Sequence, residues 1–338
     1  MAWVFEAVRF AAGLKGAVVS RIAVSLLECV LEARKTYQRL IGTLPGALVC
    51  LICTSHSLAS ETKPEELSRS SFQVIYDISY LSGLDAGAIN LRQTLDLYRP
   101  DKPHQESALP VIIYLHAGGW AFGDKKTVSL KPGYFTNQGF AFISMNYRLR
   151  WDYQVYDQAV DLISVISWLQ RTAAEYGLDT SRVVLMGHEA GGHLASLVAT
   201  DDSYLRAEGL DPALIMAVVS IDSSSYDIPR LMRELGGFRE RRLHELVFGR
   251  EEKAWQAASP ISHVAGDDTL PAFALLFNPE DEASALQAKY FARGLVRESV
   301  AVVMIPGSRE HPEDNDELLG KGDNTVTASV MTFLRSQL

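Results

Sequence analysis

The sequence predicts an α/β fold: a mostly parallel, doubly wound sheet flanked by helices. Continuous apolar, β-branched runs such as LPVIIYLHA at 109–117 are typical of parallel strands buried on both faces. Such runs alternate along the chain with helical stretches, as β-α-β repeats do. The chain has 338 residues, of which 47% are hydrophobic and 22% charged, and this composition suits a globular protein of this size.

Two half-exposed strands open the predicted sheet, because residues 72–80 and 91–100 alternate apolar and polar side chains. A helix at 155–177 follows from its apolar periodicity and its terminal glycine. Residues 230–255 are charged and helical in pattern, so we expect a surface insertion or lid near 228–256. The remaining predicted elements are buried strands at 109–117, 140–149, 182–188, 215–224, 270–278 and 300–308 and a closing helix at 324–338.

The first 60 residues differ from the main domain that we expect at 61–338. Residues 3–33 are apolar at helical spacing, and a basic group at 34–39 precedes an apolar stretch at 40–54 and small residues at 57–59. That order is the layout of a secretory signal, although it lies far from Met1. A membrane anchor and a packed soluble cap are the alternatives. A signal or an anchor predicts a secreted or periplasmic protein with membrane association through residues 1–60, and a cap predicts a cytoplasmic one.

The charge and the cysteines exclude several classes of function. A net charge of −9 argues against non-specific binding to nucleic acid. Cys29, Cys50 and Cys53 are the only cysteines, and no Cys/His spacing matches a metal site, so the rest of the chain needs no disulfide or thiol chemistry. We expect a small-molecule substrate or ligand, no metal and no cofactor; the sequence specifies no oligomeric state.

One stretch has the frame of a nucleophile elbow. In VVLMGHEAGGHLAS at 183–196, an apolar strand meets G-x-E-x-G and a helical pattern follows. The usual motif is G-x-S-x-G, in which a sharp strand-to-helix turn exposes a catalytic serine. Glu189 stands at the serine position. The N–H of Ala190 falls at the helix N-terminus, where the helix dipole favours negative charge.

Ligands of open α/β sheets bind outside the carboxyl ends of the strands. A small-residue turn, His116 to Trp120, follows the strand 109–115, and its Gly118 and Gly119 can aim backbone N–H groups at a developing oxyanion. The alternative is an ordinary glycine turn.

Two further strand ends carry titratable residues. Asp281 follows the strand 270–277 and can orient an imidazole, with Glu280 and Glu282 as close rivals. His311 follows the strand 300–305 and can reach back over the sheet to the elbow. The alternatives without a function are that Asp281 belongs to an ordinary acidic loop and that His311 is an exposed loop histidine.

The chain order nucleophile, acid, histidine is that of the α/β-hydrolases. Between about 72 and 338 the sequence resembles their esterase–formamidase branch, that is, BD-FAE-like (feruloyl esterase-type) hydrolases, carboxylesterases and arylformamidases. The stretches that carry the resemblance are IYLHAGGWAFGDK, FISMNYRL, RVVLMGHEAGGHLASLVA, SYDI and ASPISHV.

The resemblance implies specific roles at the site. Gly118, Gly119 and Ala190 would form the oxyanion hole, and Asp281 and His311 would be the acid and the base. The sequence departs from the family pattern in two places. Ala117 occupies a position where the family usually has glycine, and Glu189 occupies the position of the serine.

Glu189 rules out the serine mechanism, because an ionised carboxylate has no proton to give to a base. Its long side chain is expected to reach the place of a substrate carbonyl, where the N–H groups of Gly118, Gly119 and Ala190 would bind it. Four interpretations follow. The protein is a silent pseudoenzyme or binding protein, or it uses Glu189 as a carboxylate nucleophile, or a serine was replaced to silence an esterase, or another residue acts, such as one of the serines at 223–225.

Overall fold

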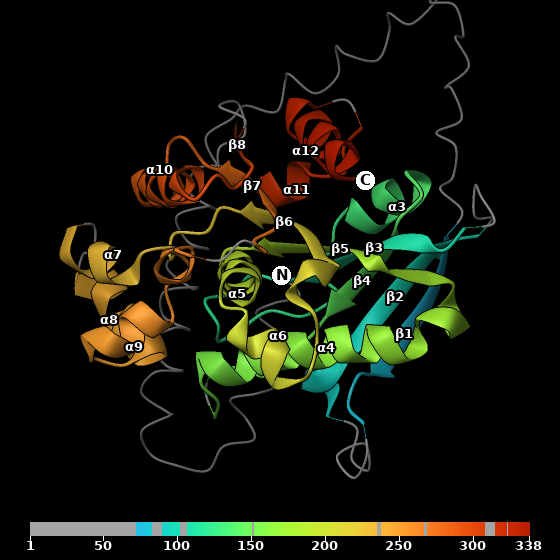
Figure 1. Cartoon of the computed structure of the whole chain (residues 1–338), viewed down its shortest axis with the longest axis horizontal. Coiled ribbons are helices and arrows are strands. Elements are labelled where there is room, and N and C mark those ends of the chain that lie inside the picture. Colours follow the sequence, from blue (N-terminus) through green and yellow to red (C-terminus); the bar gives the residue numbers. More distant parts are fainter. Residues whose placement is uncertain are drawn as a thin grey trace, which may run out of the picture. The chain divides into compact units, whose positions relative to one another are not determined.

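The computed structural model describes residues 72–338 except for 83–89, 102–106, 151, 235–237, 267–268, 308–314 and 323 (Figure 1). The expected signal, anchor or cap at 1–60 and the candidate base His311 therefore lie outside the described residues.

The described strands form one eight-stranded mixed sheet in the order β1-β2-β4-β3-β5-β6-β7-β8. β1 pairs antiparallel with β2, β2 pairs antiparallel with β4, and the other neighbours are parallel. The predicted mostly parallel sheet is thereby confirmed. The strands are β1 Phe72–Ser79, β2 Thr94–Pro100, β3 Leu109–Leu115, β4 Ala141–Met145, β5 Leu178–His188, β6 Ile215–Ile221, β7 Ala272–Phe277 and β8 Val302–Pro306.

Several strands are shorter than the sequence predicts. Leu91–Gln93 form a 3-10 turn, η2, because the side chain of Asn90 accepts a hydrogen bond from the N–H of Arg92 and caps it. The strands predicted at 109–117, 140–149 and 215–224 end at Leu115, Met145 and Ile221. The residues beyond β3 and β6 form turns at the carboxyl edge of the sheet, where the candidate site lies.

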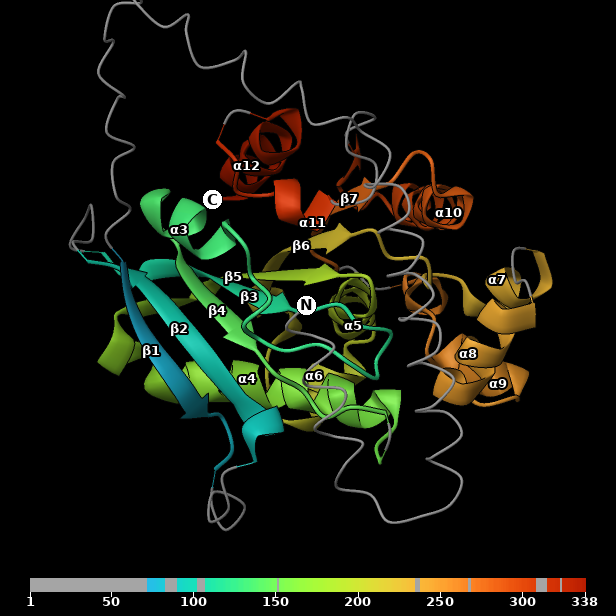
Figure 2. The ribbon, with the colours of Figure 1, turned by 180° about the vertical axis from the view of Figure 1, so that it is seen from behind.

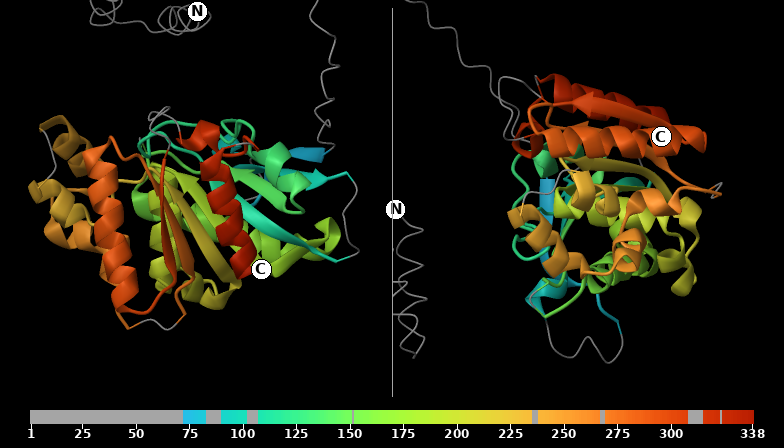
Figure 3. Two further views of the ribbon diagram at one scale, coloured as in Figure 1. Left: turned by 90° about the horizontal axis from the view of Figure 1, so that it is seen from above. Right: turned by 90° about the vertical axis from the view of Figure 1, so that its left-hand side faces the viewer.

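Helices cover both faces of the sheet, and each face has its own apolar core (Figures 1 and 2). On one face pack α4 (Val155–Tyr176), α5 (Ala190–Thr200) and α10 (Glu282–Arg297). On the other face pack α3 (Lys131–Asn137) and α12 (Thr325–Gln337). Figure 3 shows α10 and α12 on either side of β8. Every residue of β3 and of α5 is buried, so the helix that follows the elbow and a strand beside it are fully enclosed.

Helices α7 (Ile228–Glu234), α8 (Phe238–Phe248) and α9 (Glu252–Ala257) occupy the stretch between β6 and β7, at one end of the domain (Figure 1). The shorter elements are α6 Ser203–Ala207, α11 Asn315–Leu318, η3 Pro212–Leu214 and η4 Pro260–His263. Within the described ranges no helix is long and apolar enough to cross a membrane. The same ranges hold no group of three or more His, Cys, Asp or Glu side chains arranged for a metal ion.

Candidate active site

Glu189 lies in a sharp turn between the end of β5 at His188 and the start of α5 at Ala190. Its backbone has φ 46° and ψ −109°, a strained conformation for a residue with a side chain. The N–H of Glu189 donates to the carbonyl of Ile221 at 2.8 Å, and its own carbonyl accepts from the N–H of His193 at 2.9 Å. The neighbouring strand and the new helix therefore hold the strained residue in place.

The glycines around Glu189 are required by close backbone packing. A Cβ atom at Gly187 would lie 2.3 Å from the backbone of Gly191, and one at Gly191 would lie 2.2 Å from the carbonyl oxygen of Leu115. A Cβ at Gly192 would meet the hydroxyl of Ser220 at 2.7 Å. Any larger residue at these positions would push α5 away from the strand ends, so the glycines set the geometry of the elbow.

The side chain of Glu189 is exposed and does not cap its own helix. We expected the N–H groups of Gly118, Gly119 and Ala190 to bind its carboxylate. Within the described residues, no hydrogen bond joins the carboxylate to these donors. The turn thus leaves the Glu189 side chain exposed, and the expected binding of its carboxylate by these three N–H groups is wrong for this structure.

The predicted oxyanion loop is the tight turn after β3. Gly118, Gly119 and Trp120 all have positive φ, at 127°, 56° and 61°. The N–H groups of Ala121 and Phe122 both donate to the carbonyl of Gly118, which closes the turn. A Cβ at Gly118 would lie 2.4 Å from the carbonyl oxygen of Phe122, so only glycine fits there. A Cβ at Gly119, by contrast, would meet nothing within 4 Å, so the space beside that residue is open.

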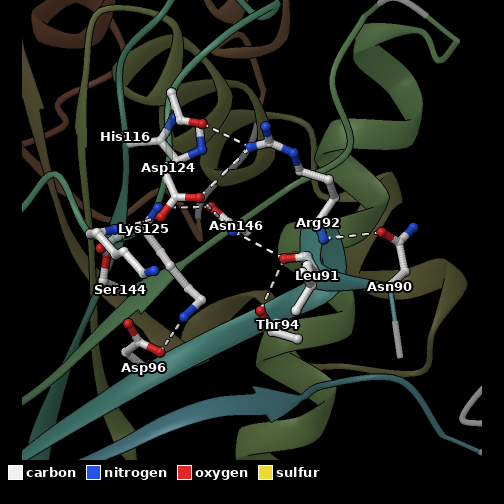
Figure 4. Close-up of polar contacts among 12 residues, drawn as sticks. Asn90, Leu91, Arg92, Thr94, Asp96, His116, Asp124, Lys125, Ser144 and Asn146 are labelled. Carbon is white, nitrogen blue, oxygen red and sulfur yellow. Dashed lines mark hydrogen bonds and ion pairs between the residues drawn. The ribbon is translucent and has the colours of Figure 1, made fainter. Parts of the chain in front are cut away.

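A network of polar contacts around the buried ammonium of Lys125 fixes the far end of this loop (Figure 4). The ammonium of Lys125 is paired with Asp96 on β2 and with Asp77 on β1, the latter at 2.7 Å. The backbone N–H of Lys125 donates to the side chain of Asn146 at 2.7 Å, and Arg92 donates to the carbonyl of Gly123 at 2.8 Å. The predicted oxyanion loop is therefore anchored to β1 and β2, to η2 and to the residue that follows β4, as a preorganised set of donors would require.

His116, the first residue of the loop, has a structural role. Its ring stacks on Tyr147 at 4.3 Å between centroids, and its Nδ1 lies 2.8 Å from the carbonyl oxygen of Ala117. Burial lowers the pKa of His116 to about 4, so the ring is neutral at physiological pH. The hydroxyl of Tyr147 donates to the carbonyl of His116 at 2.7 Å. These contacts hold the start of the loop against the sheet.

Trp120 joins the oxyanion loop to the insertion. Its indole N–H donates to Nδ1 of His193 at 3.2 Å, and Nε2 of His193 lies 2.7 Å from the carbonyl oxygen of Ala258. Nε2 must therefore carry the proton of a neutral ring, and burial lowers the pKa of His193 to about 4. The Trp120 ring also packs edge-on against Phe248 of α8 at 5.0 Å. The insertion thus contacts the loop that would bind an oxyanion.

Asp281 lies after β7, as the chain order of an α/β-hydrolase requires. Its side chain is exposed and accepts hydrogen bonds from the N–H groups of Ala283 at 3.0 Å and Ser284 at 3.3 Å. Asp281 is therefore the N-cap of α10. Its pairing with His311 stays a prediction, because His311 lies outside the described residues.

Sequence reasoning missed a second carboxylate at this edge, Asp222, which directly follows β6. Its φ is 49°, and the side-chain amide of Asn315 donates to its two oxygens at 2.8 and 3.0 Å. Burial raises the pKa of Asp222 to about 6, and the hydrogen bond from Asn315 partly offsets that rise. The signal in the sequence was a lone acid ending an apolar strand.

The serines at 223–225 are not placed as a second nucleophile. Ser223 and Ser225 are buried, at 2% and 1% exposure. The hydroxyl of Ser225 lies 3.1 Å from Nε2 of His244 on α8, a contact that ties the insertion to the end of β6. Ser225 therefore helps to hold the insertion against the end of β6.

The strand order and the strained turn between β5 and α5 define an α/β-hydrolase fold. Within that superfamily the chain belongs to the BD-FAE family, whose model matches residues 95–290.

Individual relatives agree with this membership. A probable carboxylic ester hydrolase, LipM, of Mycobacterium tuberculosis is 26% identical over 227 residues, covering 65% of this chain and 50% of that protein. Esterase LipC of the same organism is 28% identical over 238 residues, covering 64% of this chain and 56% of that protein. The chain therefore spans about half the length of these relatives. Among solved structures, esterase B from Lactobacillus rhamnosis has the same fold, with a TM-score of 0.64, 22% identity and coverage of 95% and 94% of the two chains.

Proposed function

We propose that this protein is a silent esterase-type binding protein, which holds a small ester or aryl amide in an α/β-hydrolase site without cleaving it by the serine mechanism. The observation that carries the proposal is Glu189 at the apex of the elbow, with φ 46°, in the place of a nucleophile. A carboxylate there is a poor nucleophile toward a carbonyl carbon, and it has no proton for a base to take. Similarity to LipM, a probable carboxylic ester hydrolase, and to the esterase LipC supports the choice of esters as the ligand class.

The oxyanion loop supports a ligand with a carbonyl oxygen. Gly118 and Gly119 have positive φ in the turn that follows β3, and Ala190 begins α5, whose first N–H groups are unpaired within the helix. Such donors suit a neutral carbonyl oxygen. The negative charge of Glu189 beside them would disfavour an anionic ligand. The site is thus suited to an uncharged ester or amide and is poorly suited to the carboxylate product of hydrolysis.

A binding experiment tests the proposal. The full chain is screened by thermal shift and calorimetry with short aryl esters, an aryl formamide and the corresponding carboxylates. We expect an uncharged compound to raise the Tm without being consumed. Glu189→Gln, which keeps the size of the side chain and removes its charge, should strengthen the binding of the carboxylates. Rapid hydrolysis of the ester by the unmodified protein would contradict the proposal.

A second candidate function uses Glu189 as a nucleophile on a saturated carbon. The exposed side chain, free of a capping bond to its own helix, favours it. A carboxylate oxygen would form an ester bond to the carbon while the leaving group departs with the bonding electrons. Water would then attack the carbonyl carbon of that ester and release an alcohol. Single turnover in heavy-oxygen water should label Glu189, and an unlabelled Glu189 after product has formed excludes this route.

A further inference from the structure

The chain order of nucleophile, acid and histidine gives no role to Asp222, a carboxylate at the carboxyl edge of the sheet. In the parallel ladder of β5 and β6, His188 pairs with Ile221. Glu189 and Asp222 are therefore the first residues beyond the paired ends of two adjacent strands. Both have positive φ, at 46° and 49°, which is unusual for residues with side chains. Strain of this kind persists where surrounding contacts fix it, so the contacts of Asp222 are informative.

Asp222 connects the ends of several elements. Its N–H donates to the carbonyl of Leu276 on β7 at 2.8 Å. Its carboxylate accepts from the backbone N–H of Asn278, just past β7, and from the side-chain amide of Asn315, the first residue of α11. Asn315 in turn packs against the end of β8, because a Cβ at Gly307 would lie 2.0 Å from its Oδ1. The carboxylate of Asp222 thus joins β6, β7 and α11.

The next residue of α11 connects the same region to the elbow. Asp316 is buried and accepts from the ammonium of Lys131 and from the hydroxyl of Tyr114, both at 2.8 Å. Nδ1 of His188, the residue before Glu189, lies 3.9 Å from the Asp316 carboxylate. α11 is therefore held at Asn315 by Asp222, and at Asp316 by the buried ion pair with Lys131.

We propose that Asp222 is a positioning carboxylate of this site, which holds the ends of β6 and β7 and the start of α11 in register with the elbow. Asp222 follows β6, which lies between the elbow strand β5 and β7, the strand that precedes Asp281. Asp281 differs from it in exposure and in partners, because its hydrogen bonds go to the first turn of its own helix. A carboxylate that is largely buried and hydrogen-bonded to two other elements fixes those elements relative to its own strand. An exposed N-cap mainly stabilises the one helix that it begins.

The protonation of Asp222 gives the proposal a measurable signal. Burial raises the pKa of Asp222 to about 6; the bond from Asn315 and the charge of His188 lower it, and the charge of Asp281 raises it. The other charged groups of the cluster are Asp316 of α11 and Lys131 of α3, which pair with each other. Between about pH 5 and pH 7 the carboxylate therefore gains or loses its charge, and its bonds to Asn278 and Asn315 change strength with it.

Backbone amide NMR on the full chain, from pH 4.5 to pH 8, tests the proposal without any enzymatic activity. In a His188→Gln background, which removes the ionisable ring next to Glu189, the amide of Glu189 and the side-chain amide of Asn315 should show an inflection near pH 6 that is absent when Asp222→Asn is added. Asp281→Asn should keep the inflection and move its midpoint to lower pH, because a neighbouring negative charge is lost. Asp211→Asn, which removes an exposed capping carboxylate ahead of β6, is the matched control and should leave the inflection unchanged. A flat Glu189 amide in the His188→Gln protein, or an inflection that persists when Asp222→Asn is added, would overturn the proposal.

A second arm rests on the proposed function and uses the Glu189→Ser background. There, adding Asp222→Asn should lower kcat by about 100-fold with little change in KM, since small displacements of reacting groups cost about that much. It should also remove an ionisation near pH 6 from the kcat/KM profile. An unchanged kcat and profile would contradict the positioning role. If Glu189→Ser shows no turnover at all, the proposed function fails, and the amide titration still decides the role of Asp222.

Discussion

The backbone N–H of Glu189 donates a 2.8 Å hydrogen bond to the carbonyl oxygen of Ile221, at the end of the adjacent strand. This bond and the 2.9 Å bond from the N–H of His193 to the carbonyl of Glu189 hold the elbow through main-chain atoms alone. The strained turn therefore does not depend on the carboxylate. A different side chain at position 189 would be presented in the same place, which makes substitution at this position informative about chemistry.

Gly187→Ala should destabilise the protein strongly. The new methyl group would lie 2.3 Å from the backbone of Gly191, and backbone atoms cannot move aside without displacing α5. We expect a loss of about 1–3 kcal/mol or more in the free energy of unfolding, measured by urea denaturation. Gly322→Ala is the matched control, because a Cβ there meets nothing within 4 Å, and it should change stability little. Equal effects of the two substitutions would argue against the close packing of the elbow.

Lys131→Met should cost about 3–5 kcal/mol, because it leaves the carboxylate of Asp316 buried without its cation. Lys131 is fully buried and Asp316 is 4% exposed. The double variant Lys131→Met with Asp316→Leu should be more stable than Lys131→Met alone, since it removes the unpaired charge as well. Denaturation of the two variants and the wild type checks this order. A double variant less stable than the single one would show that the pair itself is not the source of the effect.

Acidification should destabilise the fold through His116 and His193. Burial lowers the pKa of each from 6.5 to about 4. The unfolded chain therefore binds these protons first, so the stability from the neutral rings is present above pH 6.5 and is lost as the pH falls towards 4. Each histidine contributes up to about 3 kcal/mol to that loss. His193→Gln, which can still accept from Trp120 and donate to Ala258, should reduce the slope of unfolding free energy against pH; an unchanged slope would contradict the assignment.

The contribution of Asp222 to the free energy of unfolding should depend on pH in the opposite direction. Its pKa is raised from 3.8 to about 6, so the folded state binds the proton more tightly than the unfolded chain. The associated stability is present below about pH 4 and is lost as the pH rises through 6. The difference in unfolding free energy between wild type and Asp222→Asn should therefore fall between pH 4 and pH 6 and level off above it. A difference that is constant with pH would show that Asp222 titrates normally.

Local patterns in the sequence predicted the sheet and the elbow. The β-branched run at 109–117 marks a strand that is buried throughout, and the G-x-E-x-G frame locates Glu189 between β5 and α5. The position of Asp222 in the site was missed, because its partner Asn315 is 93 residues away and no local pattern encodes such a contact. The exposure of the Glu189 side chain was also missed, since its rotamer depends on the packed turn. Asp281 follows β7 as predicted, but its capping of α10 was missed, because it depends on where that helix begins.

The central claim is that one side chain, Glu189, silences an otherwise esterase-like site. Steady-state hydrolysis of a short aryl ester and an aryl formamide by wild type, Glu189→Gln and Glu189→Ser tests it most directly. The glutamine variant is the control for removal of charge without gain of a nucleophile. We predict no turnover above background by wild type or Glu189→Gln, and turnover at least about 100-fold higher by Glu189→Ser, because serine restores a hydroxyl that a base can activate. A folded Glu189→Ser protein that hydrolyses neither substrate would contradict the account.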